Sequence, residues 1–356
     1  MMLRAICQGA ATALLLSGWA WCEGLTLTAP VDYQVVQRSN WTRGTVSIAG
    51  SVGDASRPRP ALEARVVVGG ADRAWQALKP TWNGDAFTAD TEVPAGGWHR
   101  LEVRASEGEV VSTAVVEHVG VGEVFVVAGQ SNSANHGEEK QASSTGLVAA
   151  YGGARWQLAN DPQPGASGRG GSFLPPLGDA LAEELKVPIG FVPCGIGATS
   201  VREWLPKGAR FPNPPTIERR VKKRPDGLWE SKGEAYAMFV ARMKSLGPNG
   251  FRAVLWHQGE SDANQRDATR TLPGRLYREY LEKLIRDSRK DLGWEVPWFV
   301  AQVSYHVPGD ESSPEIRAAQ ASLWRDGVAL EGPDSDAIKG RFREREGQGV
   351  HFSGPG

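Results

Sequence analysis

The stretch VFVVAGQSNSANHGE, from Val124 to Glu138, decides how the fold of this chain is interpreted. Its first five residues form a continuous apolar run, which is typical of a strand covered on both faces in a parallel sheet. Gly129 then permits a tight turn, and small polar side chains follow it. The stretch therefore predicts a buried strand whose end carries a polar turn.

Ser131 in this turn has two interpretations. The start of a helix after a strand presents free backbone N–H groups, so a serine there can be a nucleophile surrounded by donors for a developing oxyanion. Alternatively, Ser131 or Asn132 merely caps a helix, which serine and asparagine often do. The motif alone leaves both interpretations open.

Further along the chain, helical patterns alternate with apolar runs. Helical spacing covers 177–187, 236–247, 276–291 and 313–324, and apolar runs follow at 189–194, 254–256, 297–303 and 327–332. Alternation of this kind predicts a parallel α/β sheet with helices on both faces.

The first part of the chain has a different pattern. Residues 25–120 contain short β-rich segments separated by Gly, Pro, Asp and Asn, with no long helical period. This pattern predicts a small β-sandwich domain, followed by an α/β domain over residues 121–356.

The N-terminus predicts export. Arg4 precedes an apolar segment from Ala10 to Ala20, which is too short to span a bilayer, and small residues follow near Gly24. Residues 1–24 are therefore interpreted as a cleaved signal peptide, which predicts a secreted or periplasmic protein. No later segment is expected to cross a membrane.

The composition argues against several functions. The 356 residues include 40 Lys and Arg against 41 Asp and Glu, so no basic surface for nucleic acid is expected. Beyond Cys7 and Cys22 of the predicted leader only Cys194 remains, and a lone cysteine forms neither an intramolecular disulfide nor a zinc site. No metal or cofactor is expected, and the sequence indicates no oligomeric state.

Polar clusters are expected to meet at one edge of the sheet, because ligands of parallel α/β sheets bind beyond the carboxyl ends of the strands. GQSN, GIGATSVREW and HQGESD each follow an apolar run, and GVHFS lies near the end of the sequence. The Gly-rich segment 165–172 lacks the Lys-Ser/Thr ending of a phosphate loop and is expected to be a mobile loop near the site.

A nucleophilic serine requires a base, and the base requires a third group that orients it. Among the six histidines, His257 and His351 lie at strand ends or in edge loops, and each can be the base or a structural residue. His136 lies one or two helical turns after Ser131 and is expected to point elsewhere. The residues alone leave the base undecided.

The motifs GQSN, PCGIGATSVREW, WHQGESDA and VHFS together resemble the sialate O-acetylesterase (SASA) domain. This domain belongs to the SGNH/GDSL hydrolase superfamily and is related to the acetylxylan esterases of carbohydrate esterase family six. The resemblance spans about residues 122–353. It implies an SGNH-type, flavodoxin-like three-layer fold and a serine carboxylic ester hydrolase that removes acetyl groups from sugars.

The resemblance also implies roles for individual residues. Ser131 matches the nucleophile of the family and His351 matches the general base, which leaves His257 in a supporting position. Gly197 and Gln258 match the groups that hold the oxyanion together with the N–H of Ser131. Apart from the resemblance, Asn132 is expected to bind the substrate, and Arg202 and Trp204 of SVREW are candidates to hydrogen-bond or stack on a sugar. The alternative is that they are a surface arginine and a core tryptophan. An arginine near the site would suit the carboxylate of a sialic acid.

This sequence departs from the family pattern at two places. Many relatives have an aspartate three residues before the base, where this chain has Gln348. Glu260 is therefore the first choice for the orienting acid, with Asp334 and Asp336 in reserve. Relatives also continue past VHFS into a helix, so the C-terminal helix of the domain is expected to be missing from this sequence.

The expected substrate is an acetylated glycan, either a sialic acid or a hemicellulose. Two alternatives remain from other classes. One is a carbohydrate-binding protein without catalysis, and the other is a lipase or thioesterase of the same superfamily.

Overall fold

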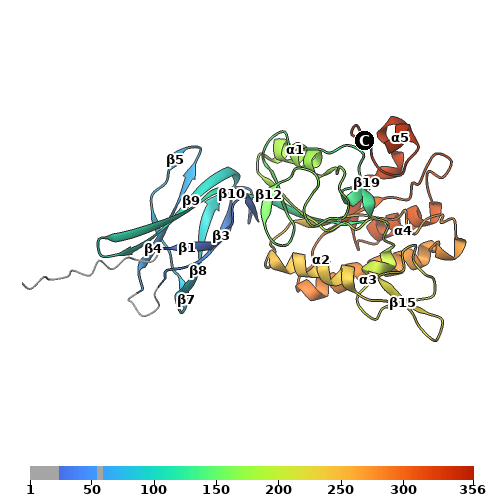
Figure 1. The fold of residues 1–356 in the computed structure, drawn as a ribbon, viewed down its shortest axis with the longest axis horizontal. Coiled ribbons are helices and arrows are strands. Elements are labelled where there is room, and N and C mark those ends of the chain that lie inside the picture. The colour runs from blue at the N-terminus through green and yellow to red at the C-terminus, as the bar shows by residue number, and fades with distance from the viewer. Residues whose placement is uncertain (1–23, 54–58) are drawn as a thin grey trace, which may run out of the picture.

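The computed structural model describes residues 24–53 and 59–356, which form a mixed α/β fold (Figure 1). Residues 1–23 of the predicted signal peptide, with Cys7 and Cys22, lie outside these ranges. No helix within the described ranges is long and apolar enough to cross a membrane.

The first part of the chain consists of strands, drawn at the left of Figure 1. One sheet has the order β1-β3-β8-β7, and in a second sheet β9 pairs with β4 and β10. Burial alternates along β3 and β8, so one face of that sheet is covered and the other is exposed. The strands are β1 Thr26–Ala29, β2 Gln34–Gln37, β3 Arg43–Ser51, β4 Ala61–Val68, β5 Ala71–Asp72, β6 Gln76–Ala77, β7 Thr81–Asn83, β8 Ala86–Pro94, β9 Gly96–Glu107 and β10 Val110–Gly129.

The central sheet of the second part has the strand order β12-β11-β13-β10-β17-β18-β19. Its strands are parallel except for β12, which pairs antiparallel at one edge. This arrangement agrees with the alternation of helices and apolar runs in the sequence. The remaining strands of this sheet are β11 Val148–Tyr151, β12 Trp156–Leu158, β13 Ile189–Pro193, β17 Ala253–His257, β18 Trp298–Gln302 and β19 Leu330–Asp334.

Helices cover both faces of the sheet, with α1 on one face and α2 and α3 on the other (Figure 1). Alternate side chains of β10 enter two different clusters: Val124 and Val126 pack with residues of α2 and α3, whereas Phe125 and Val127 pack with residues of α1. The continuous apolar run is thus explained by burial on both faces. The helices are α1 Leu174–Leu185, α2 Glu234–Ser245, α3 Gly274–Leu292, α4 Pro314–Arg325 and the short α5 Glu344–Gly347.

Shorter elements connect these layers. A small sheet of three strands precedes α2, and single 3₁₀ turns stand at several loop ends. They are β14 Arg210–Phe211, β15 Val221–Lys223, β16 Trp229–Ser231, and the turns η1 Ser131–Ser133, η2 Val201–Trp204, η3 Ala268–Arg270, η4 Ser335–Ala337 and η5 Gly340–Phe342.

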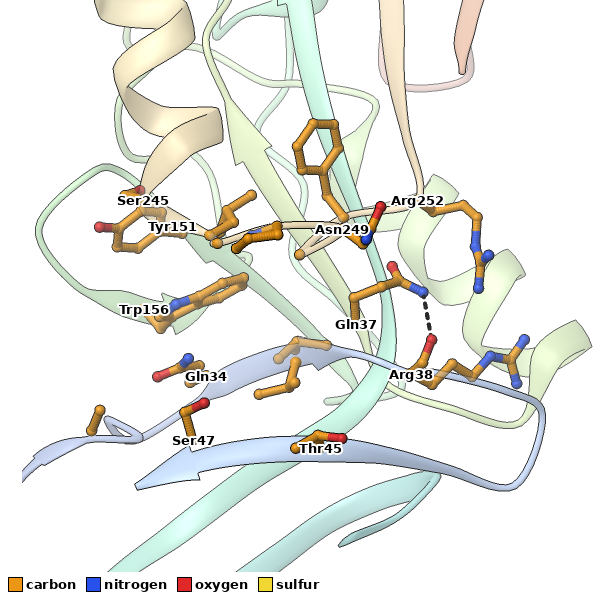
Figure 2. Close-up of a pocket in the computed structure, with 18 of the residues that line it drawn as sticks. Gln34, Gln37, Arg38, Thr45, Ser47, Tyr151, Trp156, Ser245, Asn249 and Arg252 are labelled. Carbon is orange, nitrogen blue, oxygen red and sulfur yellow. Dashed lines mark hydrogen bonds between the residues drawn. The ribbon is translucent and has the colours of Figure 1, made fainter. Parts of the chain in front are cut away.

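Strand β10 joins the two parts of the chain, because its early residues pair with β9 and its late residues with β13 and β17. At the junction, the carboxylate of Glu123 binds Arg38 and Arg252, each at 2.7 Å. Burial opposes ionisation of Glu123, but hydrogen bonds from Arg252, Gln37 and Arg38 outweigh it and lower its pKa. A groove of about 1190 Å³ lies beside this junction, between the two parts (Figure 2).

Candidate active site

Ser131 follows β10 in a tight turn that only glycine permits. At Gly129 the φ angle is 133°, and an added Cβ would lie 2.0 Å from the carbonyl oxygen of His257. Ser131 then begins the single 3₁₀ turn η1, and the next α-helix starts only at Leu174. The interpretation of Ser131 as the cap of an α-helix is therefore wrong, since no α-helix follows directly.

The reactive groups of Ser131 are free for chemistry. Within the described ranges, neither its hydroxyl nor its backbone N–H has a hydrogen-bond partner. The hydroxyl oxygen is also not one of the polar side-chain atoms that are both shielded from solvent and without a hydrogen-bond partner. Ser131 is therefore a buried residue whose hydroxyl still meets solvent.

The side chain of Asn132 connects this turn to the segment that carries His351. Its Nδ2 donates to the carbonyl oxygen of Val350 at 3.2 Å, and its Oδ1 accepts from the N–H of Phe352 at 3.3 Å. Both neighbours of His351 are thus fixed to the residue after Ser131. The expectation that Asn132 contacts the sugar is not supported, because both polar ends of its side chain bind protein groups.

His351 is oriented by a carboxylate that the sequence analysis missed. Its Nδ1 lies 3.0 Å from Oε1 of Glu344, and the N–H of Glu344 donates to the carbonyl of His351 at 2.9 Å. When Nδ1 donates its proton to a carboxylate, Nε2 is left as an acceptor, which is the tautomer that a general base needs. The pair thus has the arrangement of a base with its orienting acid.

The carboxylates chosen from the sequence lie elsewhere. Oε1 of Glu260 accepts from Asn132 at 3.0 Å and Oε2 accepts from the N–H of Gly259 at 3.1 Å, so neither oxygen is placed on His351. Asp334 and Asp336 bind the guanidinium of Arg317 instead. The structure therefore does not support Glu260, Asp334 or Asp336 as the acid beside His351, and the carboxylate in contact with that ring is Glu344.

The sequence did not indicate that Glu344 contacts His351, because it lies seven residues before that histidine and belongs to no motif. The backbone reverses between the two residues through Arg345 and Glu346, whose φ angles of 52° and 55° lie in the left-handed region. Such angles are uncommon for residues other than glycine. The contact therefore depends on a local backbone path that sequence patterns do not predict.

Glu260 is a buried residue that binds the side chain of Asn132. Burial raises its pKa to about 7, against a smaller opposing effect of the hydrogen bond from Asn132. Its backbone carbonyl accepts from Nε2 of His306 at 2.6 Å. Glu260 thus fixes the side chain of Asn132, and Asn132 in turn binds the backbone on both sides of His351.

The two predicted oxyanion donors are occupied by protein acceptors. The N–H of Gly197 donates to Oγ of Ser167 at 2.7 Å. Gln258 is 0% exposed. Its Nε2 lies 2.8 Å from Oδ2 of Asp262, with two further acceptors at 3.1 and 3.2 Å. These assignments are corrected, because a buried amide with three acceptors has no proton left for a substrate.

His136 lies beside the base, contrary to expectation. Its ring centroid is 5.5 Å from that of His351, and its Nε2 is 3.2 Å from Oγ of Ser167. Burial lowers the pKa of His136, and the neighbouring His351 lowers it further. The expectation assumed a helix after Ser131, whereas the chain leaves η1 in a nearly extended conformation and returns His136 to the site.

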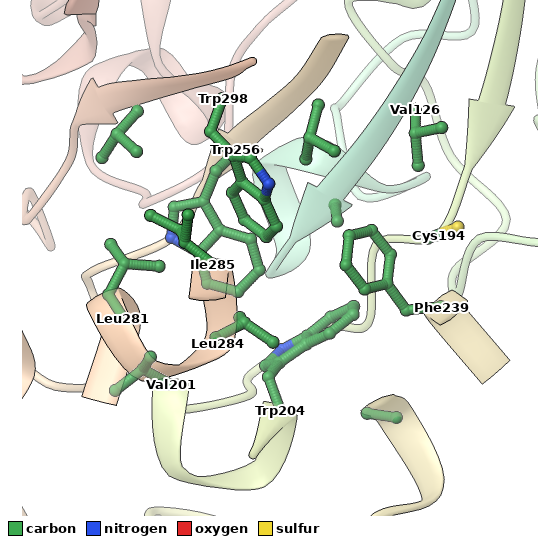
Figure 3. Close-up of a cluster of buried hydrophobic side chains, with 14 of the residues drawn as sticks. Val126, Cys194, Val201, Trp204, Phe239, Trp256, Leu281, Leu284, Ile285 and Trp298 are labelled. Carbon is green, nitrogen blue, oxygen red and sulfur yellow. The ribbon is translucent and has the colours of Figure 1, made fainter. Parts of the chain in front are cut away.

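Arg202 and Trp204 are structural residues and not sugar contacts. Arg202 is 0% exposed, and its Nη2 binds Oδ1 of Asp262 at 3.1 Å. Trp204 packs edge-on against Trp256 and Phe239 in the core cluster (Figure 3). The predicted contacts are wrong because both side chains point into the protein interior.

His257 occupies the supporting position that the resemblance implied. Its Nε2 lies 2.8 Å from Oγ of Ser335, and its ring packs near Phe173 and Phe352. Burial lowers the pKa of His257 to about 3, and the charge of Arg343 adds to this effect. The ring is therefore neutral at physiological pH.

A small pocket of about 60 Å³ lies between Asn132 and Phe352. Glu139 is the charged residue among those described that line it, and no described Lys or Arg lines it. Over residues 24–53 and 59–356, no group of three or more His, Cys, Asp or Glu is arranged to hold a metal ion.

Comparisons with known proteins identify the family of the second part of the chain. Residues 121–353 match the family described as carbohydrate esterase, sialic acid-specific acetylesterase. A curated "probable carbohydrate esterase" of Arabidopsis thaliana is 25% identical over 196 residues, which are 48% of this chain and 64% of the relative. This chain therefore spans less than two thirds of the length of that relative.

A solved structure resembles most of the chain. It is described as a novel carbohydrate acetylesterase from Xanthomonas citri, with 18% identity and a TM-score of 0.53. The likeness covers 93% of this chain and 72% of that protein. At this identity the likeness shows the fold alone.

Proposed function

The chain belongs to the carbohydrate esterase family of sialic acid-specific acetylesterases, and we propose that it hydrolyses acetyl esters of sugars through a serine acyl-enzyme. One observation carries this proposal. Asn132 fixes both neighbours of His351 to the turn that begins with Ser131, while Glu344 holds Nδ1 of the ring. A free serine hydroxyl and an oriented imidazole thus belong to one rigid unit.

In the first half-reaction, Oγ of Ser131 attacks the acetyl carbonyl carbon and its proton passes to Nε2 of His351. The C=O bond becomes a C–O⁻ oxyanion in the tetrahedral intermediate. When the intermediate collapses, the bond to the sugar oxygen breaks and His351 returns the proton to that oxygen. The products are the free sugar hydroxyl and acetyl-Ser131.

In the second half-reaction, His351 takes a proton from water, whose oxygen attacks the acetyl carbon of acetyl-Ser131. The bond from that carbon to Oγ then breaks, acetate leaves, and His351 returns the proton to Oγ. The free N–H of Ser131 is our choice for an oxyanion donor in both halves, since it has no partner in the described part of the chain. Glu344 stabilises the imidazolium that forms each time.

The fold and location are part of the same proposal. We assign the sheet and helices of residues 121–356 to the SGNH type with three layers, and residues 25–120 to a β-sandwich domain. The strand order and the helices on both faces support the first assignment. The apolar segment before Gly24 supports a signal peptide and hence a secreted or periplasmic enzyme.

A neutral sugar suits the site better than a sialic acid does. The argument for a sialate carboxylate relied on Arg202, and that guanidinium is buried against Asp262. The small pocket beside Asn132 also has no Lys or Arg among its described lining residues, so no cation is in place there for an anionic sugar. Acetylated hemicellulose is therefore the proposed substrate class.

Acetate release from a substrate panel tests this function. Acetylated xylan, acetylated xyloglucan and O-acetylated sialic acids should be compared under the same conditions. We expect turnover of the hemicelluloses and much slower release from the sialic acids. Exclusive turnover of the sialic acids would reverse the substrate assignment but leave the mechanism standing.

Nitrophenyl esters of increasing chain length separate this function from that of a lipase or thioesterase. A sugar acetylesterase should show a sharp fall in rate beyond acetate or propionate. A rate that rises toward octanoate indicates a lipase, and an absence of hydrolysis indicates a binding protein.

A further inference from the structure

A second region of the molecule has the features of a ligand site and takes no part in the proposed reaction. The groove between the two parts of the chain has a volume of about 1190 Å³ and is lined by β2, β3, β11, β12 and the loop after α2. Pockets for single small molecules usually measure about 300–1,000 Å³. The groove therefore has room for a ligand with several rings.

The groove lies at the edge of the sheet opposite to Ser131. Its lining includes Arg252 and Pro297, which precede the parallel strands β17 and β18. Ser131 and its partners follow the carboxyl ends of the strands. A strand of five residues such as β17 spans about 16 Å, so the groove cannot be part of the active site.

Aromatic residues line one wall of the groove, where Tyr151 is partly exposed and Trp156 is buried beneath it. Tyr151 and Trp156 form a cross-strand pair with ring centroids 5.3 Å apart and an interplanar angle of 24° (Figure 2). Trp294 lines another side and packs against Phe251. Aromatic faces carry partial negative charge and attract the polarised C–H groups of a sugar ring.

Polar groups without internal partners also line the groove. Within the described residues, the hydroxyl of Tyr151, the amide of Asn249 and Nε2 of Gln34 make no hydrogen bond. The other end of the Gln34 amide is fixed, because its Oε1 accepts from the N–H of Val31 at 3.0 Å. These groups are available to donate to and accept from hydroxyls of a ligand.

The charges along the groove are neutralised. Arg38 and Arg252 both bind Glu123, and Glu295 lies 3.3 Å from Arg289. An anionic ligand would find no free cation among the described lining residues. The lining thus favours an uncharged ligand with many hydroxyl groups.

We propose that this groove binds a segment of a neutral oligosaccharide. The ring of Tyr151, held by the buried Trp156, stacks on a sugar ring, and the amides of Gln34 and Asn249 bind sugar hydroxyls. The site would hold the enzyme on a polymeric glycan while Ser131 acts at the opposite edge. The choice of a glycan rests on the proposed function, but the binding itself requires no catalysis.

Titration calorimetry tests the proposal on the full chain carrying Ser131→Ala, so that hydrolysis plays no part. The probes are xylohexaose, cellohexaose and mannohexaose, with hexagalacturonate as an anionic comparison. We expect at least one neutral hexasaccharide to bind. Tyr151→Ala should then raise its Kd by about tenfold or more, equivalent to roughly 1.4 kcal/mol.

Two milder variants guard against loss of folding. Tyr151→Phe removes the hydroxyl and keeps the stacked ring, and Asn249→Gly removes the amide at a residue whose φ of 53° suits glycine. Each should weaken binding several-fold with an unchanged thermal midpoint. Trp75→Ala, on a different surface between Arg65 and Arg104, should leave the Kd as it is.

The proposal is overturned if no neutral hexasaccharide binds at millimolar concentration, or if hexagalacturonate alone binds. It is equally overturned if the folded groove variants bind as tightly as the parent. A failure of the proposed esterase function would be seen separately, as an absence of ester hydrolysis by the native chain.

Discussion

Nδ1 of His351 lies 3.0 Å from Oε1 of Glu344, and the N–H of Glu344 donates to the carbonyl oxygen of His351. The proposed acid and the proposed base are therefore carried by one short loop. Because the backbones are also hydrogen-bonded, the ring is held with Nδ1 toward the carboxylate, which favours the tautomer that presents Nε2.

Glu344→Ala should reduce kcat for p-nitrophenyl acetate by about 10²–10⁴-fold, because an unsupported imidazole loses its orientation and the stabilisation of its charged form. Steady-state kinetics measures the effect. The matched control is Asp334→Asn, since Asp334 binds Arg317 and not the base. Equal losses in the two variants would contradict the assignment of Glu344.

Asn132→Ala should reduce kcat for acetylated xylan by roughly 10–100-fold with little change in KM. The reason is that displacement of a catalytic group by about 1 Å can lower the rate by about 10²-fold. The variant loses the bonds to Val350 and Phe352 that hold the base segment. Asn213→Ala, at an exposed amide that binds Thr269, is the control. A raised KM with full kcat would return Asn132 to a role in sugar binding.

Glu260 makes stability depend on pH in a defined direction. Burial raises its pKa to about 7 from an ordinary 4.5, so between these values the native state keeps a proton that the unfolded chain has released. Its contribution to the free energy of unfolding is present below pH 4.5 and falls as pH rises to 7. The loss amounts to about 3 kcal/mol.

Glu260→Gln removes this titration. Urea unfolding at pH 4.5 and pH 8 should show that the variant gains about 3 kcal/mol relative to the native chain between the two pH values. Glu183→Gln, at an exposed position of α1, should follow the native chain at both. A constant difference across this range would mean that Glu260 ionises normally.

Arg202→Ala should destabilise the fold by about 3–5 kcal/mol, because it leaves the buried carboxylate of Asp262 without its partner. Urea unfolding measures the loss. KM for acetylated xylan should stay unchanged in the folded fraction. Arg210→Ala, at an exposed ion pair 3.9 Å long, should cost less than about 1 kcal/mol. If Arg202→Ala kept its stability and raised KM, the result would indicate that Arg202 contacts the sugar.

Much of the fold could be predicted from hydrophobic patterns. The apolar run Val124 to Ala128 corresponds to the end of β10. The helical spacing of residues 276–291 corresponds to α3, whose bounds differ by only one or two residues from the prediction. Such patterns are reliable because burial on one or both faces dictates them.

The site was harder to predict where a role depends on side-chain direction. SVREW follows a strand at the correct edge, yet its Arg202 and Trp204 turn inward, because η2 places them against Asp262 and the tryptophan cluster. Glu344 and His136 reach the base through loop conformations without a sequence period. The position of a residue in the sequence indicated that it lies at this edge of the sheet. It did not indicate whether the side chain points toward the site or into the protein interior.

The central claim is that Ser131 is the nucleophile, and its direct test is p-nitrophenyl acetate hydrolysis by Ser131→Ala. We predict a fall to the uncatalysed background, a loss of roughly 10⁴-fold or more, at an unchanged thermal midpoint. Ser133→Ala, in the same turn but bound to the carbonyl of Gln130, should keep measurable turnover. Native turnover in folded Ser131→Ala would contradict the account.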